Sequence, residues 1–373
     1  MSPDTPRPNL DDLVDRFERV ANARAETGKL DAPADVVLSE MEAAVGRATG
    51  DHDVEVALPG PPPEPFSAPP ATPAAPAPAK PIASRPQDLE AWLAGGERVE
   101  VELAGGRRYR IFTRVLGEGP WLTCIHGFPT SSWDWAAVAP SLAQRYSLLV
   151  FDLVGFGDSD KPSGHDWSAF EQADVIEALW RRFGVESTGV LAHDVGLTVS
   201  LELLARQHDG KLDTRIERMT LLNGGVYAGF HRPRPIQVWL QRPVVGALIA
   251  RMLSETRFGP ALAEVFGPSH QPSALDLHQH WLSVSRRNGS RNYHRLIRYI
   301  PERRVNAARW EEALEGAGVP VRYVWGMADP VSGAHMAKVI RERQPGADIV
   351  ELPGVGHYPQ LETPERVADA IPG

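Results

Sequence analysis

The stretch TGVLAHDVGLTVSLELLAR (188–206) decides the fold. An apolar, β-rich run (188–194) passes directly into a helical pattern, so the chain turns sharply around Ala192-His193-Asp194-Val195-Gly196. Small residues at Ala192 and Gly196 let backbones come close in such a strand-to-helix turn. A carboxylate in the middle, Asp194, can attack carbon and form an ester intermediate. The same aspartate could instead serve only as the N-cap of the helix.

Two residues farther along the chain favour the catalytic interpretation. His357 lies in a glycine-containing loop directly after the run DIVELPG (348–354), where a base would follow the nucleophile in chain order. Asp329 follows the run VRYVWGM (321–327), where its carboxylate could orient that histidine. Asp329 could also be a turn residue before Pro330. Three such residues in this order, each after a strand, predict an Asp-Asp-His catalytic set.

Outward from this segment, short apolar β-rich runs alternate with helical patterns such as 170–184. Middle runs that are apolar throughout indicate strands buried on both faces. The first two runs are separated only by AGGRR, which predicts a hairpin. The sequence therefore predicts an α/β fold with a mostly parallel eight-stranded sheet, helices on both faces and an antiparallel start. The expected strands are 98–103, 109–116, 121–127, 147–153, 188–194, 218–224, 321–327 and 348–354.

The alternation stops between 231 and 310, where the pattern is helical and lacks strands. We interpret 231–310 as a helical cap over the carboxyl ends of the strands, inserted into a core of 87–230 and 311–373. This insert holds 13 arginines, four acidic residues and no lysine. Its positive charge suggests an acidic substrate or peripheral contact with an anionic membrane surface. The alternative is that these arginines are solvated or paired with the acidic core.

The N-terminal part differs in composition. Of 34 prolines, 12 fall within 59–86, which predicts a disordered, proline-rich linker. Helical spacing of apolar residues before it predicts a partly helical arm at 1–58, too short for a core of its own.

Composition excludes several classes of protein. Lys and Arg number 39 against 48 Asp and Glu, a formal charge of −9, which argues against nucleic-acid binding. The single cysteine, Cys124, excludes a disulfide framework and is expected in a buried strand. Neither a membrane-spanning segment nor a secretory signal is evident, so we expect a cytoplasmic protein. No motif for a metal or nucleotide cofactor is present, and the sequence does not give the oligomeric state.

The turn His126-Gly127-Phe128-Pro129 follows the third expected strand. The backbone N–H groups of Phe128 and Val195 could form an oxyanion hole beside Asp194.

Together these residues resemble the α/β-hydrolase superfamily, on its epoxide hydrolase and haloalkane dehalogenase side, in which an aspartate is the nucleophile. The closer resemblance is to the mesoderm-specific transcript proteins. It implies the α/β-hydrolase fold, the site at Asp194, Asp329 and His357, and a cis bond between Phe128 and Pro129. The resemblance extends over most of the chain after the linker, in the segments CIHGFPTSSWDW (124–135), FDLVGFGDSDKP (151–162), FEQADVIEAL (170–179), LAHDVGLTVSLELL (191–204), LLNGGVYAGFHRP (221–233), WGMADPV (325–331) and GHYPQLETP (356–364).

Three functions compete on this basis, of which the first two act on a small-molecule substrate. The first is epoxide hydrolysis, for which the resemblance implies a proton donor among the cap tyrosines Tyr293 and Tyr299. The second is haloalkane dehalogenation, which needs N–H donors for the halide. Val195 and Phe128 stand where dehalogenases commonly carry such donors, although the cap tryptophans Trp239 or Trp281 could substitute. The third is a non-catalytic binding or scaffold protein that retains the fold.

Overall fold

The computed structural model describes residues 86–162 and 164–372. The predicted arm at 1–58 lies outside the described residues, as does all of the predicted linker at 59–86 except Pro86. Nothing in the described part tests those two predictions.

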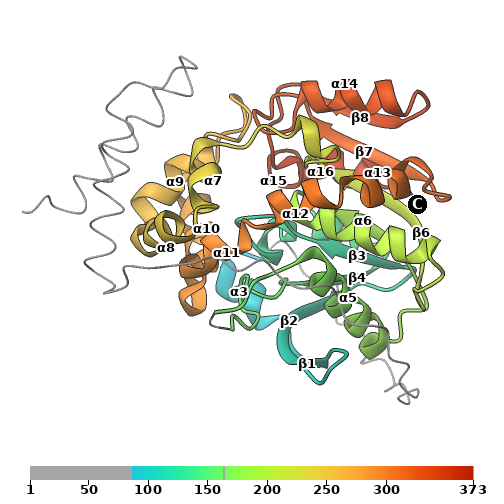
Figure 1. The fold of residues 1–373 in the computed structure, drawn as a ribbon, viewed down its shortest axis with the longest axis horizontal. Coiled ribbons are helices and arrows are strands. Elements are labelled where there is room, and N and C mark those ends of the chain that lie inside the picture. The colour runs from blue at the N-terminus through green and yellow to red at the C-terminus, as the bar shows by residue number, and fades with distance from the viewer. Residues whose placement is uncertain (1–85, 163, 373) are drawn as a thin grey trace, which may run out of the picture.

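An eight-stranded sheet forms the centre of the molecule (Figure 1). Its strand order is β1-β2-β4-β3-β5-β6-β7-β8. β1 and β2 form an antiparallel hairpin, β2 also pairs antiparallel with β4, and the remaining neighbours are parallel. The predicted mostly parallel sheet with an antiparallel start is confirmed. The strands are β1 (Glu97–Glu102), β2 (Arg108–Leu116), β3 (Trp121–Ile125), β4 (Ser147–Phe151), β5 (Ser187–Ala192), β6 (Arg215–Leu222), β7 (Val321–Gly326) and β8 (Asp348–Leu352).

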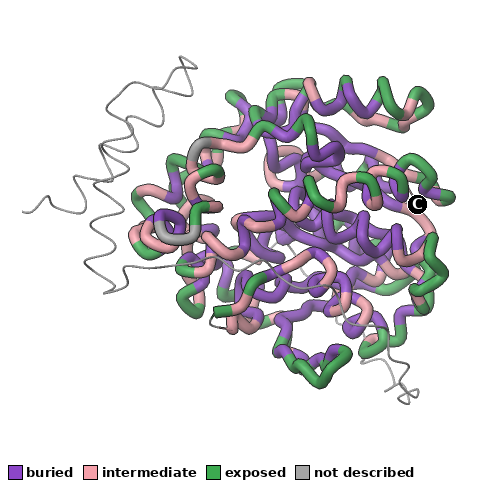
Figure 2. Tube along the Cα trace, in the orientation of Figure 1, coloured by how far each residue is buried: buried purple, intermediate pink, exposed green. Residues whose placement is uncertain are grey.

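The central strands are apolar throughout because both faces of the sheet are covered. Side chains alternate between the faces along β4: Leu149 and Phe151 join one buried apolar cluster, and Leu148 and Val150 join the other. Purple tube therefore dominates the centre of Figure 2. The first cluster includes residues of α5 (Ala169–Phe183), α6 (Val195–His208), α13 (Ala307–Glu315) and α14 (Ala334–Arg343). The second includes residues of α3 (Leu89–Ala94), α4 (Ala139–Leu142) and α16 (Pro364–Ala370).

Helix α5 shows how local sequence sets an element's ends. The Ser168 hydroxyl accepts a hydrogen bond from the N–H of Glu171, and so caps the first turn. Gly184 ends the helix at φ 65°, a left-handed conformation that glycine adopts without steric cost. The predicted helix at 170–184 therefore differs from the observed one by a single residue at each end.

Between β6 and β7 the described residues contain helices and no strand, as predicted. Contacts with the core place this segment at the carboxyl ends of the strands. Tyr293 donates a hydrogen bond to the Pro129 carbonyl after β3, and the Val265 carbonyl accepts one from the His357 N–H after β8. Its exact bounds as a cap at 231–310 stay a prediction. Ahead of α13, the helices of this segment are α7 (Pro235–Leu240), α8 (Pro243–Met252), α9 (Glu255–Ala263), α10 (Ala274–Ser285), α11 (Tyr293–Leu296) and α12 (Tyr299–Val305), with 3-10 turns at Ala228–Phe230 and Arg286–Asn292.

Several arginines of this segment form ion pairs with carboxylates of the core. Arg286 and Arg287 both contact Asp158, and Arg295 and Arg298 both contact Asp166. These pairs favour the interpretation in which cap arginines neutralise an acidic core. Peripheral membrane contact through this surface stays a prediction.

Two further predictions concerned the single cysteine and membrane-spanning segments. Cys124 is buried in β3, as predicted. Within residues 86–162 and 164–372, none of the helices combines the length and apolar character needed to cross a bilayer.

Candidate active site

Asp194 sits at the sharp turn between β5 and α6. Its backbone adopts φ 48° and ψ −110°, a conformation that costs energy for a non-glycine residue and is found most often at functional sites. The turn requires glycine two residues later, because a Cβ on Gly196 would lie 2.3 Å from the Ile125 carbonyl oxygen. The Asp194 side chain makes no capping hydrogen bond to α6. The interpretation of Asp194 as only the N-cap of the helix is therefore wrong.

The Asp194 carboxylate is buried and presents its two oxygens to different groups. Oδ1 accepts a hydrogen bond of 2.9 Å from the Phe128 N–H, and the Tyr299 hydroxyl lies 3.5 Å from the same atom. Oδ2 lies 3.6 Å from Nε2 of His357. One oxygen is thus held by donors while the other faces the histidine.

His357 is oriented by Asp329, which follows β7. Nδ1 of His357 lies 2.8 Å from Oδ2 of Asp329. The same carboxylate accepts hydrogen bonds from the Ser332 hydroxyl at 2.6 Å and from the Val331 N–H at 2.7 Å. The Val331 contact also closes the turn before Pro330, so Asp329 both shapes the turn and orients the histidine.

The charges of this set shift one another's pKa values. Burial disfavours a charged imidazole, yet the carboxylates of Asp329 and Asp194 raise the pKa of His357 to about 10. Burial alone would raise the pKa of the Asp194 carboxyl, but the hydrogen bond and charge of His357 hold it well below its usual range. The pKa of Asp329 is lowered for the same reason. At neutral pH the resting site therefore holds an imidazolium between two carboxylates.

Of the two amides expected in an oxyanion hole, one contacts the carboxylate directly. The Phe128 N–H donates to Asp194. Val195 begins α6 with its side chain buried, but its N–H is not among the groups of the described residues that donate to the Asp194 carboxylate. The bond between Phe128 and Pro129 is cis, as the resemblance implied.

The two candidate tyrosines lie together but have different partners. Both rings contact Phe128, with centroids 5.1 Å away for Tyr293 and 6.1 Å for Tyr299. The Tyr293 hydroxyl donates to the Pro129 carbonyl at 2.7 Å, whereas the Tyr299 hydroxyl faces Asp194. Tyr299 is therefore the better placed of the two to act next to the carboxylate.

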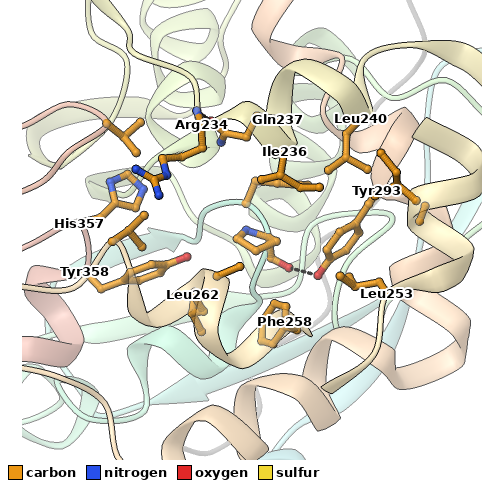
Figure 3. A pocket seen from close by; sticks show the side chains of 17 residues that line it. Arg234, Ile236, Gln237, Leu240, Leu253, Phe258, Leu262, Tyr293, His357 and Tyr358 are labelled. Atoms are coloured by element: carbon orange, nitrogen blue, oxygen red, sulfur yellow. Dashed lines mark hydrogen bonds between the residues drawn. The ribbon is translucent and has the colours of Figure 1, made fainter. Parts of the chain in front are cut away.

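A cavity of about 110 Å³ leads to this site (Figure 3). Its lining includes Phe128 and His357, both of which contact Asp194. Trp281 packs against Phe258 of the cavity wall, with ring centroids 5.7 Å apart, but neither Trp281 nor Trp239 lines the cavity. Most of the wall is apolar, from Ile236, Leu240, Ile249, Leu253, Phe258, Leu262 and Val265.

Two residues of the site were missed in the sequence. Asn223, directly after β6, donates through Nδ2 to Oδ2 of Asp329 at 2.9 Å, and its backbone carbonyl accepts from the Asp194 N–H at 3.0 Å. His193 donates through Nε2 to the His357 carbonyl at 2.7 Å, and burial lowers its pKa to about 3, so it stays neutral. The position of Asn223 after a strand was a usable signal, because polar residues there face the same edge as Asp194 and Asp329.

The sheet order, the turn at Asp194 and the loop positions of Asp329 and His357 together define an α/β hydrolase. Comparison with known proteins agrees: a family model described as the alpha/beta hydrolase fold matches residues 120–364, and the chain belongs to this family.

Among curated proteins, the putative hydrolase LipZ of Mycobacterium tuberculosis is 39% identical over 262 residues, covering 70% of this chain and 90% of LipZ. The mesoderm-specific transcript homolog protein of Homo sapiens is 34% identical over 274 residues, covering 71% of this chain and 81% of the relative. The resemblance to the mesoderm-specific transcript proteins is confirmed.

Solved structures show the same fold at lower sequence identity. A haloalkane dehalogenase loop variant from Bradyrhizobium elkanii has a TM-score of 0.61 at 20% identity, covering 74% of this chain and 94% of the dehalogenase. The epoxide hydrolase CorEH has a TM-score of 0.58 at 21% identity, covering 74% of this chain and 96% of CorEH.

Proposed function

We propose that the protein is a hydrolase with Asp194 as its nucleophile and that it opens epoxides. The observation that carries the proposal is that the two oxygens of the Asp194 carboxylate face different groups. Oδ1 accepts from the Phe128 N–H at 2.9 Å, and Oδ2 lies 3.6 Å from Nε2 of His357. Oδ2 can attack substrate while Oδ1 is already held by the Phe128 N–H.

In the first step, Oδ2 of Asp194 forms a bond to a ring carbon and the carbon–oxygen bond of the epoxide breaks. The epoxide oxygen takes the phenolic proton of Tyr299, whose hydroxyl lies 3.5 Å from Asp194. The products are an ester on Asp194 and a phenolate on Tyr299. Forming the ester removes one of the two negative charges that raise the pKa of His357. The imidazolium then gives its proton to the Tyr299 phenolate, which restores the phenol and leaves a neutral His357 that can act as a base.

In the second step, Nε2 of His357 takes a proton from water, and the hydroxide attacks the carbonyl carbon of the ester. Negative charge develops on Oδ1 of Asp194, where the Phe128 N–H already donates. The ester bond breaks, and the leaving oxygen takes the proton from His357, which releases a diol. The carboxylic acid left on Asp194 gives its proton to His357, which restores the resting carboxylate and imidazolium.

Haloalkane dehalogenation is the second candidate, since the same two steps run with a halide as the leaving group. The fold shared with haloalkane dehalogenases supports it. Against it, a halide needs N–H donors, and the cavity wall among the described residues contains no tryptophan. Tyr299 beside the carboxylate favours an alkoxide leaving group, which needs a proton. The third candidate, a non-catalytic scaffold protein, predicts no turnover at all.

Turnover of a mixed panel of epoxides and haloalkanes tests the proposal. Diol formation from epoxides that is lost in Asp194→Ala supports it, and Lys338→Ala on the exposed face of α14 serves as the control variant. Halide release without diol formation would establish the second candidate. The absence of any turnover that depends on Asp194 across the panel would favour a scaffold.

A further inference from the structure

A second pocket, of about 570 Å³, lies where the cap meets the loop between β4 and α5. Cationic side chains from that loop, from α8, from the 3-10 turn and from α11 line it, namely Lys161, Arg251, Arg287, Arg291 and Arg295. No carboxylate lies among the described residues of its lining. We call it the basic pocket; its volume is in the range of sites that hold small molecules.

The positive charge of the basic pocket exceeds the negative charge in contact with it. Arg251 and Arg291 are exposed, and neither side chain forms an ion pair or a hydrogen bond with a described residue. Arg287 and Arg295 each contact one carboxylate of the core. Each of these two carboxylates is shared with a second arginine of the cap. Two guanidinium groups of the pocket therefore stand free to bind a ligand.

The 3-10 turn that carries part of the pocket is held tightly in place. A Cβ on Gly289 would lie 2.9 Å from Cε of Lys161, so the turn packs directly on the loop after β4. Arg287 and Asn288 have φ 51° and 59°, in the left-handed region, which costs energy for such residues and is commonest at functional sites. The Lys161 ammonium donates to three backbone carbonyls of its own loop. Lys161 thus adds charge to the wall, while the arginines supply free donors.

The rest of the pocket is built on two helices that also form the apolar cavity. A Cβ on Gly246 of α8 would lie 3.0 Å from the Cβ of His294 in α11, so these helices are in close contact. Ile249 of α8 and Tyr293 of α11 line the apolar cavity, whereas Arg251 and His294 line the basic pocket. The two cavities therefore share helices but no lining residue.

The titratable groups of the pocket have the pKa shifts that a positive environment favours. Burial, with a smaller contribution from the charge of Arg287, lowers the pKa of Lys161 to about 8. Burial, and then neighbouring arginine charges led by Arg295, lower the pKa of His294. Like charges that are held together repel, and a bound anion would offset this repulsion. Guanidinium groups bind phosphate oxygens especially well, through paired N–H donors.

We propose that the basic pocket binds a phosphoryl group, with Arg251 and Arg291 as its main ligands. The side-chain amides of Asn288 and Asn292 also line the pocket and can donate to phosphate oxygens. A phosphoryl group suits a site with several cations because it carries more than one negative charge. It can belong to a soluble phosphorylated molecule or to the headgroup of an anionic lipid. The proposal is independent of the chemistry at Asp194, and binding is measured without turnover.

Calorimetry with inorganic pyrophosphate tests the site on the full-length protein. At about 0.15 M salt, where exposed charges are largely screened beyond about 8 Å, the unaltered protein should still bind the probe saturably. The double variant Arg251→Gln/Arg291→Gln should bind it about tenfold more weakly or worse. The matched control is Arg232→Gln/Arg304→Gln, which removes two exposed arginines of the same segment outside the pocket and should leave binding unchanged. Thermal melting of both variants confirms that they are folded.

Sedimentation with phosphatidylcholine vesicles, with and without phosphatidic acid, distinguishes the two sources of the phosphoryl group. Capture that requires phosphatidic acid and is lost in Arg251→Gln/Arg291→Gln identifies a lipid headgroup. Pyrophosphate binding without such capture identifies a soluble phosphorylated ligand. The site is overturned if neither probe binds, or if the pocket variant and the control variant bind the probes equally well.

Discussion

Nε2 of His357 lies 3.6 Å from Oδ2 of Asp194, while Nδ1 of the same ring lies 2.8 Å from Asp329. The imidazole therefore bridges two carboxylates, of which only Asp194 has a positive φ, at 48°. This arrangement assigns different tasks to the two aspartates. Asp329 fixes the ring, and Asp194 is the carboxylate that the proposed function makes the nucleophile.

Replacement of His357 should separate the two halves of the proposed reaction. In His357→Gln the ester on Asp194 can still form, but no base remains to activate water, so the ester should accumulate. Intact-protein mass spectrometry after mixing with an epoxide should show a stable gain equal to the mass of the substrate. His208→Gln is the matched control and should show no such gain, because it changes a histidine in the last turn of α6 whose Nε2 donates to the Ala317 carbonyl at 3.0 Å. Multiple turnovers at the normal rate by His357→Gln would contradict the assignment of the base.

Oxygen labelling should identify the nucleophile. In a single turnover in heavy-oxygen water, the oxygen that attacks the ester carbonyl stays on the protein, since the epoxide oxygen and one aspartate oxygen leave with the diol. The peptide that contains Asp194 should therefore gain one heavy oxygen, and the peptide that contains Asp329 should gain none. Label found only in the diol would mean that water attacks the substrate directly.

Stability should depend on pH through His357. Its pKa in the folded protein is about 10, above the ordinary value of 6.5. A raised pKa contributes stability that is fully present below about pH 6.5 and is lost as the pH rises through 10. The free energy of unfolding lost in His357→Gln should thus be larger at pH 6 than at pH 10. Denaturant titrations of both proteins at the two pH values measure this, and an equal loss at both would contradict the ionic bridge.

The grouping of the three candidate site residues was predictable from the sequence because each of them follows a β-rich run. Carboxyl ends of parallel strands meet at one edge, so Asp194, Asp329 and His357 could be placed together without coordinates. The strand predictions extended two residues too far in several runs, for example 188–194 against Ser187–Ala192. The extra residues, such as His193 and Asp194, belong to the mostly polar turns that follow the strands.

The partners of the cap residues could not be predicted in the same way. Spacing gave no means to tell that Tyr299 faces Asp194 while Tyr293 donates to a backbone carbonyl, since both lie in short helical segments with similar neighbours. The burial of Arg303 could not be predicted either, because the sequence does not distinguish it from the other arginines among the 13 of the insert. Only tertiary packing distinguishes them.

The two tyrosines should differ in their effect on epoxide opening. Tyr299→Phe removes the hydroxyl that faces Asp194. We expect the activation barrier to rise by roughly the 1–3 kcal/mol of a lost buried hydrogen bond, so that kcat falls about fivefold to 150-fold. Tyr293→Phe instead leaves the Pro129 carbonyl without its donor, so its main effect should be a loss of about 1 kcal/mol in stability, with a smaller change in kcat. Steady-state kinetics and thermal melting of both variants provide the comparison. A larger loss of kcat in Tyr293→Phe would instead make Tyr293 the proton donor. Its hydroxyl would then have to leave the Pro129 carbonyl when substrate binds.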